Sequence, residues 1–190
     1  MSNMLLNKNE LCILEEFSPD YHRKIYGGGV AKKLKMNQKT VSNILKKLEQ
    51  EDILKFAAEG KNKYYFLNRF NPKITDVIKL IEIGRKIRFL EKYKKLQGLF
   101  YELEKRTQDM LVIFGSYANY SANEKSDLDV FVLGKIKDVN DLEKLYHIKI
   151  NVIKSSKEKF DKSNVFIKEV VKNHVVLKGI EEFIELIWEV

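Results

Sequence analysis

The sequence predicts an α+β protein of two domains joined by a long helix, and three observations support this fold class. Residues 9–68 hold three short helical patterns, followed by two strand-like runs around a glycine-bearing tip. Residues 73–107 lack proline and repeat apolar residues at helical spacing. Residues 111–152 contain apolar runs of buried-strand length, separated by a Gly-Ser turn and polar segments.

The composition is that of a globular chain with a basic first half. Hydrophobic residues make up 44% and aromatic residues 11% of the chain, which argues against disorder. The net charge is +8, and the excess precedes residue 111, because residues 111–190 carry 12 basic and 13 acidic side chains. Between Asp20 and Glu49 there are eight Lys or Arg residues and no acid. A segment of one charge sign and this length favours a polyanionic partner.

Cysteine content and hydropathy indicate where the protein works. The single cysteine, Cys12, excludes an internal disulfide and a thiolate zinc site, and it fits a reducing compartment. No apolar run approaches the roughly 18 residues of a membrane span. The first residues also lack the pattern of a signal peptide. We therefore expect a cytoplasmic protein without a membrane partner.

The first part of the chain predicts three helices and a hairpin. Apolar spacing predicts a helix over residues 9–17. We interpret the glycines at 27–29 as a turn before a short second helix, because no Gly-Lys-Ser/Thr follows to make a phosphate loop. Asn37 is a favourable N-cap for a third helix over residues 38–52. Two strand-like runs over residues 53–68 predict the hairpin.

This order of elements resembles a winged helix-turn-helix domain over residues 9–68. The resemblance implies that the third helix enters the major groove of double-stranded DNA and that the hairpin touches the backbone or the minor groove. Amide side chains can bond adenine edges, and lysines can neutralise phosphates. The candidate DNA-binding residues are Gln38, Lys39, Thr40, Ser42, Asn43, Lys46 and Lys47 on the third helix and Lys61 and Lys63 on the hairpin. The alternative is a winged helix that contacts protein, with solvated lysines.

The connector over residues 73–107 predicts one long helix or two abutting helices, with Gly84 or Gly98 as the break. Its apolar stripe needs a covering surface. Homodimerisation would supply one, and packing on the second domain of the same chain is the alternative. The expected divisions are a winged head at residues 1–70, a connecting and dimerising helix at 71–94 and a second domain at 95–190.

The second domain contains a turn followed by two closely spaced aspartates. The run Leu111 to Phe114 predicts a buried strand that ends at Gly115 and Ser116, where a short helix begins. Free backbone amides and the Ser116 hydroxyl there would form an anion site. Asp127 and Asp129 share one face of the next strand. Two adjacent carboxylates favour a cation between them, and hard oxygen ligands near a phosphate favour Mg²⁺.

A strand, a Gly-Ser turn, a ten-residue gap and Asp-x-Asp opening another strand resemble the signature of the DNA polymerase β nucleotidyltransferase superfamily. The resemblance covers roughly residues 95–178 and is greatest to the minimal nucleotidyltransferases, small prokaryotic members of which some are antitoxins. It implies a small mixed sheet flanked by helices. It also implies that Gly115 and Ser116 hold the phosphates of ATP or another nucleoside triphosphate, and that Asp127 and Asp129 bind Mg²⁺.

One position departs from the pattern of this superfamily. Members place a third carboxylate on the next central strand, where it ligates metal and activates the attacking hydroxyl. The corresponding strand here is residues 147–154, and the corresponding position is Asn151. An amide oxygen ligates a cation weakly and does not accept a proton near pH 7. Lys149 beside it adds positive charge where the superfamily keeps negative charge.

Three functions follow from these patterns. The first is a DNA-binding regulator that binds Mg-nucleotide and transfers a nucleotidyl group to a protein or small molecule. An autoregulated antitoxin that modifies a toxin is one version of it. The second is a non-enzymatic transcriptional regulator with a degenerate nucleotidyltransferase domain as scaffold or nucleotide sensor, and Asn151 favours it over the first. The third is an RNA-directed transferase.

Overall fold

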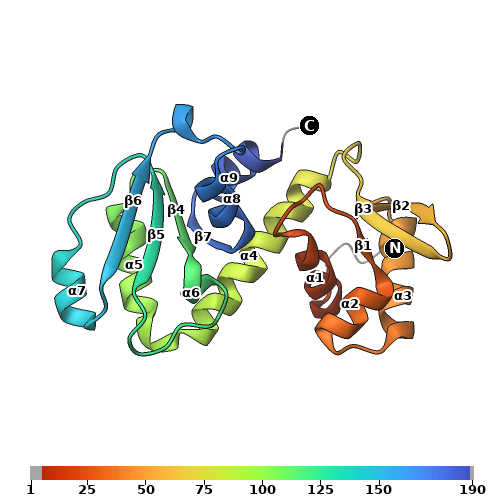
Figure 1. Cartoon of the computed structure of the whole chain (residues 1–190), viewed down its shortest axis with the longest axis horizontal. Helices are drawn as coiled ribbons and strands as arrows, with labels where there is room; N and C mark the ends of the chain where they lie inside the picture. Colours follow the sequence, from red (N-terminus) through yellow and green to blue (C-terminus); the bar gives the residue numbers. More distant parts are fainter. Residues whose placement is uncertain (1–5, 189–190) are drawn as a thin grey trace. The chain divides into compact units, whose positions relative to one another are not determined.

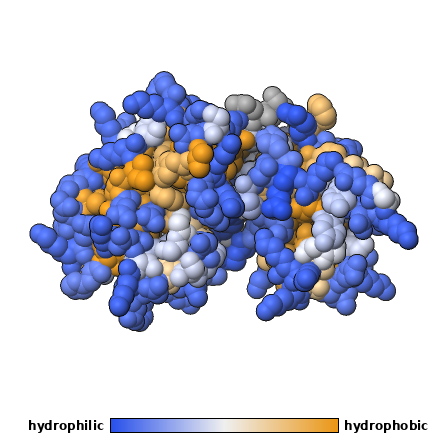
Figure 2. Space-filling view, in the orientation of Figure 1, coloured by the Kyte–Doolittle hydropathy of each residue, from blue (hydrophilic) through white to orange (hydrophobic). Residues whose placement is uncertain are grey.

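The computed structural model describes residues 6–188. The chain divides into two compact units, residues up to Ile81 and residues from Glu82. The described residues form helices and two small sheets, which confirms the α+β class (Figure 1). Hydrophilic side chains cover most of the face of each unit seen in Figure 2. Within residues 6–188, no helix is long and apolar enough to cross a membrane.

In its described residues, the first unit contains three complete helices, the first turns of a fourth and a three-stranded antiparallel sheet of order β1-β3-β2. Its helices are α1 (Lys8–Leu14), extended by the 3-10 turn η1 (Glu15–Phe17), α2 (Gly27–Leu34) and α3 (Gln38–Gln50). Its strands are β1 (Ile25–Tyr26), β2 (Leu54–Glu59) and β3 (Asn62–Leu67). The β2–β3 hairpin is paired from Leu54 with Leu67 to Glu59 with Asn62.

Side-chain caps start two of these helices. Asn7 and Glu10 form a capping box at α1, in which each side chain accepts a hydrogen bond from the backbone N–H of the other residue. At α3, the side chain of Asn37 accepts a hydrogen bond from the backbone N–H of Lys39 at 2.8 Å. Such caps satisfy amides that the first helical turn leaves unpaired.

The glycine triplet forms the first turn of α2 and not a separate turn before it, which corrects the sequence-based interpretation. The reason lies in the neighbouring Tyr26. A Cβ at Gly29 would come within 2.7 Å of the Tyr26 ring, and a Cβ at Gly28 within 3.2 Å. A side chain at either position would displace the ring, and the glycines leave room for it despite their low helix propensity.

The connector breaks at a position that the sequence did not indicate. Helix α4 (Ile74–Lys92) contains Gly84, and helix α5 (Gln97–Arg106) contains Gly98, so neither glycine ends a helix. The break is the 3-10 turn η2 (Lys94–Leu96), directly after Tyr93. The Tyr93 ring packs 5.1 Å from that of Tyr117, and the Gln97 amide donates to the carbonyl of Leu90 at 3.0 Å. Tertiary packing and a side-chain cap thus replace glycine as the cause of the break.

The second unit is built on a four-stranded mixed sheet of order β6-β5-β4-β7, in agreement with the predicted mixed sheet. The β5–β6 pair is parallel, whereas β4 pairs antiparallel with β5 and with β7. The strands are β4 (Met110–Phe114), β5 (Leu128–Leu133), β6 (Ile150–Ser155) and β7 (His174–Lys178). The remaining elements are α6 (Gly115–Ala118), α7 (Asn140–Tyr146), η3 (Lys157–Lys159), α8 (Val165–Lys172) and α9 (Ile180–Ile187).

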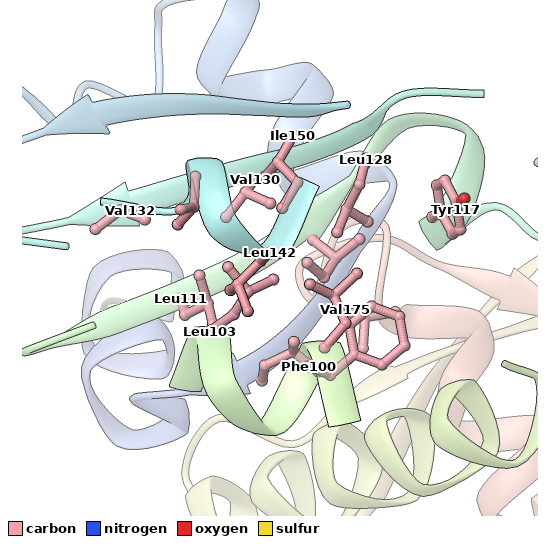
Figure 3. Close-up of a cluster of buried hydrophobic side chains, with 14 of the residues drawn as sticks. Phe100, Leu103, Leu111, Tyr117, Leu128, Val130, Val132, Leu142, Ile150 and Val175 are labelled. Carbon is pink, nitrogen blue, oxygen red and sulfur yellow. The ribbon is translucent and has the colours of Figure 1, made fainter. Parts of the chain in front are cut away.

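The two faces of this sheet have different neighbours. One face carries the main core, where Val130 of β5 packs with Leu103 of α5 and Leu142 of α7 (Figure 3). On the other face, Phe131 lies 6.0 Å from Phe166 of α8, measured between ring centroids. Because side chains alternate along a strand, the residues two positions before and after Phe131 face the same side of the sheet.

Candidate functional site

Gly115 lies where β4 meets α6, and both its backbone and its surroundings require glycine. Its φ of +68° falls in the left-handed region. A Cβ at this position would come within 2.5 Å of Oδ2 of Asp129. The loop that follows folds back on α6, because the carbonyl of Ser116 accepts from the backbone N–H groups of Ser121 and Ala122 at 2.9 and 3.0 Å. The turn and the carboxylate are therefore in close contact.

The two aspartates meet at Asn151. Asp129 is paired with Phe114 of β4 on one side and with Asn151 of β6 on the other. The Asn151 side-chain amide Nδ2 donates to Oδ1 of Asp129 at 3.1 Å and to Oδ2 of Asp127 at 3.3 Å. The Lys149 ammonium lies 3.6 Å from Oδ2 of Asp127. The fold thus brings together the turn, both carboxylates and the position expected to hold a third acid.

The geometry shows what Asn151 does in place of an acid. Its NH₂ group lies against both carboxylates and, with Lys149, offsets the repulsion between them. A half-turn of the side-chain amide would instead direct Oδ1 toward Asp127 and Asp129, because the two ends of an amide have nearly the same shape. The same residue can therefore stabilise the carboxylates or help to ligate a cation.

The donor set fits a hydrated hard cation. Among the described residues, no group of three or more His, Cys, Asp or Glu side chains is arranged to hold a metal. Asp127 and Asp129 nevertheless supply two carboxylates, and Asn151 an amide oxygen after rotation. Mg²⁺ is commonly bound by one or two carboxylates together with waters and substrate phosphates. The site is thus compatible with Mg²⁺ that arrives with a polyphosphate.

The acids that follow β5 do not replace the missing carboxylate. The Arg106 guanidinium donates to both oxygens of Asp141, at 2.5 and 2.7 Å, and to the carbonyl of Asp138 at 2.7 Å. These hydrogen bonds lower the pKa of Asp141 to about 2. Asp138 and Asp141 follow the C-terminal end of β5, whereas Asp127 precedes its N-terminal end. They are therefore separated from the aspartate pair by the length of the strand.

Tyr117 is a neighbour of the site that sequence reasoning missed. It is buried on α6, one residue after Ser116, and its ring contacts Tyr93. Burial raises the pKa of the Tyr117 phenol, and the negative charge of Asp127 raises it further. The only signal in the sequence was an aromatic residue directly after the Gly-Ser turn. Tyr117 anchors the turn to the core and so helps to position it (Figure 3).

Substituting Gly115 is expected to disrupt the site and to destabilise the second unit. Gly115→Ala combines left-handed backbone strain with a contact to Asp129, for a cost of about 1–3 kcal/mol in the free energy of unfolding. The matched control is Gly60→Ala, because Gly60 also has a left-handed φ of +60° but has nothing within 4 Å of its would-be Cβ. Denaturant unfolding of each unit measures both effects. Equal losses for the two variants would show that the contact with Asp129 contributes nothing.

The candidate DNA-binding residues of the first unit are all exposed, but their surroundings differ. Gln38 and Ser42 of α3 and Lys61 and Lys63 of the hairpin line one cavity of about 250 Å³. Lys47 instead donates to Glu10 of α1 at 2.6 Å. The Glu10 side chain is only 2% exposed, and its hydrogen bond raises the pKa of Lys47. The remaining candidates, Lys39, Thr40, Asn43 and Lys46, are solvent-exposed on α3.

Comparison with known proteins shows which family the second half of the chain resembles. Residues 94–185 match the family model described as a nucleotidyltransferase domain. This match covers β4, the Gly115 turn, both aspartates and Asn151, and it confirms the predicted nucleotidyltransferase domain. No curated protein matches the chain.

Proposed function

We propose that this chain is a DNA-binding regulator whose nucleotidyltransferase domain binds a nucleoside triphosphate together with Mg²⁺. One observation carries the nucleotide part of the proposal. Within a domain that matches the nucleotidyltransferase family, Asp127 and Asp129 share the amide of Asn151, and Asp129 lies directly against the left-handed turn at Gly115. This arrangement supports a cation site next to a backbone that phosphate can approach closely.

The residues of the site have separate roles in this proposal. Gly115 and Ser116 would hold the phosphates, and Asp127 and Asp129 would hold Mg²⁺ with help from the rotated Asn151 amide. Bound Mg²⁺ would neutralise the triphosphate charge. Lys149, 3.6 Å from Asp127, can move to a phosphate oxygen once a cation takes over the carboxylates. Transfer of the nucleotidyl group to a protein or small molecule, such as modification of a toxin by an antitoxin, is the enzymatic version of this function.

The same geometry supports a second candidate, a non-enzymatic regulator that senses nucleotide. Asn151 stands where a general base is expected, and an amide does not accept a proton near neutral pH. Lys149 beside it adds a positive charge to the same place. The domain would then bind the nucleotide but transfer the nucleotidyl group slowly, and it would act as a nucleotide-dependent scaffold.

Labelling separates the two candidates. The protein is incubated with a lysate of its host and ATP that carries a label in the α-phosphate. Mg²⁺-dependent transfer of label to a macromolecule or metabolite, lost in Asp129→Asn, supports the enzyme. If the wild-type protein binds Mg-ATP but transfers no label, the sensor is supported. Transfer that requires RNA would favour an RNA-directed transferase.

The proposal assigns DNA binding to the first unit. Three helices followed by the β2–β3 hairpin have the element order of a winged helix-turn-helix, and α3 exposes a polar face without acidic side chains before Glu49. Helix α3 would enter the major groove, and the hairpin would lie along the backbone. Homodimerisation through the connecting helix remains a prediction.

Neutralising two lysines of α3 is expected to reduce the salt dependence of DNA binding. In the double variant Lys39→Gln, Lys46→Gln, the slope of log affinity against log salt concentration should fall by about 2, because each lysine that contacts a phosphate contributes about one unit. Lys47 is left intact because it pairs with buried Glu10. The matched control is Lys154→Gln, Lys159→Gln, which removes the same charge from exposed positions of the second unit. An equal fall in the control would contradict the assignment.

A further inference from the structure

We propose that the cavity between α3 and the β2–β3 hairpin binds one sugar-phosphate unit of duplex DNA, with the Tyr26 ring as its apolar wall. The inference rests on the proposed DNA-binding function of the first unit and adds a specific site to it. Its starting point is the cavity of about 250 Å³ that Gln38 and Ser42 line from α3 and Lys61 and Lys63 line from the hairpin.

The cavity is suited to an anion. Two lysines line it, together with hydrogen-bonding groups of Gln38, Ser42 and Asn62, and none of its lining residues is acidic. The nearby acid of the hairpin, Glu59, is already paired with Lys24 at 2.9 Å. Lys63 is also positioned by packing, because its ammonium lies 3.9 Å from the centroid of the Phe56 ring. A phosphodiester entering here meets positive charge without a competing carboxylate.

Tyr26 gives the cavity an apolar wall. Its side chain is 44% exposed, so it contributes little to the buried core. The ring lies over Gly28 and Gly29 and is tilted against Tyr64 at a centroid distance of 5.7 Å. An exposed aromatic ring held between a helix and a strand residue is a preformed surface for the C–H groups of a sugar.

The glycine triplet at residues 27–29 makes room for the Tyr26 ring. Glycine is among the weakest helix formers, yet Gly27, Gly28 and Gly29 make the first turn of α2. Any side chain at 28 or 29 would meet the Tyr26 ring, at 3.2 and 2.7 Å respectively. The three glycines therefore weaken the start of α2, but they leave the space that the Tyr26 ring occupies beside the lysines of the cavity. Glycines at these positions are expected if the Tyr26 ring contacts a ligand, because an exposed ring contributes little to the stability of the fold.

The chemistry of the cavity matches a nucleic-acid backbone. A backbone unit presents a phosphate with one negative charge and an adjoining sugar with an apolar face. Lys61 and Lys63 would neutralise the phosphate, Gln38 and Ser42 would donate hydrogen bonds, and Tyr26 would cover the sugar. Inorganic phosphate shares the charge but lacks the sugar, so only a nucleic acid should need Tyr26.

The test is a pair of variants that remove the ring from its place in different ways. Gly29→Ala introduces a better helix former while displacing Tyr26, and Tyr26→Ala removes the ring. In the full chain, both should lower the affinity for a duplex DNA by about fivefold or more, in the range of a lost aromatic contact to nucleic acid. The melting temperature of Gly29→Ala should not fall.

Tyr101→Ala is the matched control, because it also removes an exposed tyrosine ring, but one that belongs to the second unit and does not line the cavity. It should leave the affinity for DNA unchanged. The duplex is titrated first with wild-type protein, and then a single-stranded oligonucleotide and inorganic phosphate are titrated in parallel.

The outcomes separate this inference from the function on which it rests. If wild-type protein binds no duplex, the proposed DNA-binding function itself fails. If wild-type protein binds but Gly29→Ala and Tyr26→Ala keep its affinity, the cavity is not a backbone site and the DNA-binding function survives. The inference would also be overturned if the variants lost affinity for the single-stranded oligonucleotide alone. The same holds if Tyr26→Ala lowered the affinity for inorganic phosphate as much as the affinity for the duplex.

Discussion

Replacing Asn151 with aspartate is expected to raise the rate of nucleotidyl transfer by about 100-fold or more, the lower end of what a positioned general base contributes. Asn151 already contacts both aspartates, so a carboxylate in its place would join the proposed cation site without any change of backbone. An acid there can also accept the proton of an attacking hydroxyl, which the amide cannot. Label transferred from α-phosphate-labelled ATP in host lysate measures the rate.

The same variant has a second readout that needs no acceptor. Three carboxylates without a cation repel one another, so Asn151→Asp should unfold at lower denaturant concentration in chelator and recover stability with Mg²⁺. Asn151→Leu is the control of similar size, and it should gain neither transfer nor Mg²⁺-dependent stability. If Asn151→Asp bound Mg-ATP but transferred no faster than wild type, Asn151 would not occupy the base position.

Removing both aspartate charges is expected to weaken Mg-ATP binding by about 100-fold or more. Asp127→Asn, Asp129→Asn deletes both anionic ligands, a larger change than loss of an outer-shell partner, which itself costs 10- to 100-fold. Without Mg²⁺ the variant should be at least as stable as wild type, because the substitutions remove a like-charge contact while Asn151 can still donate to the new amide oxygens. Calorimetric titration gives the affinity, and thermal unfolding gives the stability.

Asp138→Asn, Asp141→Asn is the matched control for this experiment. It removes the same charge at the opposite end of β5, where Asp141 pairs with Arg106. It should leave Mg-ATP affinity unchanged. A similar loss of affinity in both double variants would assign the effect to net charge and not to the site. Retained affinity in Asp127→Asn, Asp129→Asn would remove these residues from the proposed cation site.

The sequence predicted those parts of the fold that local patterns encode. The α+β class, the mixed sheet and the nucleotidyltransferase domain were predicted and are confirmed. Strand β5 was recognisable because Leu128, Val130 and Val132 recur at every second position after the polar segment that ends at Asp127. The same alternation places Asp129 on the face opposite Val130, and the Gly-Ser turn, the ten-residue gap and Asp-x-Asp together located the aspartate pair.

What the sequence did not predict depends on contacts between distant residues. The break after Tyr93 follows from packing on Tyr117, and the ion pair of Lys47 with Glu10 joins residues 37 positions apart. The helical glycines at 27–29 depend on where the Tyr26 ring lies. For Asn151, sequence reasoning identified the altered position but not the donation to both aspartates, because rotamer and strand register together set that geometry.

The measurement that tests the account most directly is a calorimetric titration of ATP into the wild-type protein, once with Mg²⁺ and once with a chelator. The arrangement of Gly115, Asp127 and Asp129 predicts saturable one-site binding with Mg²⁺ and a large loss of affinity in chelator, because two carboxylates repel a triphosphate that brings no cation. Absence of binding in Mg²⁺ for ATP and for the other nucleoside triphosphates, or binding indifferent to the metal, would contradict the proposed site.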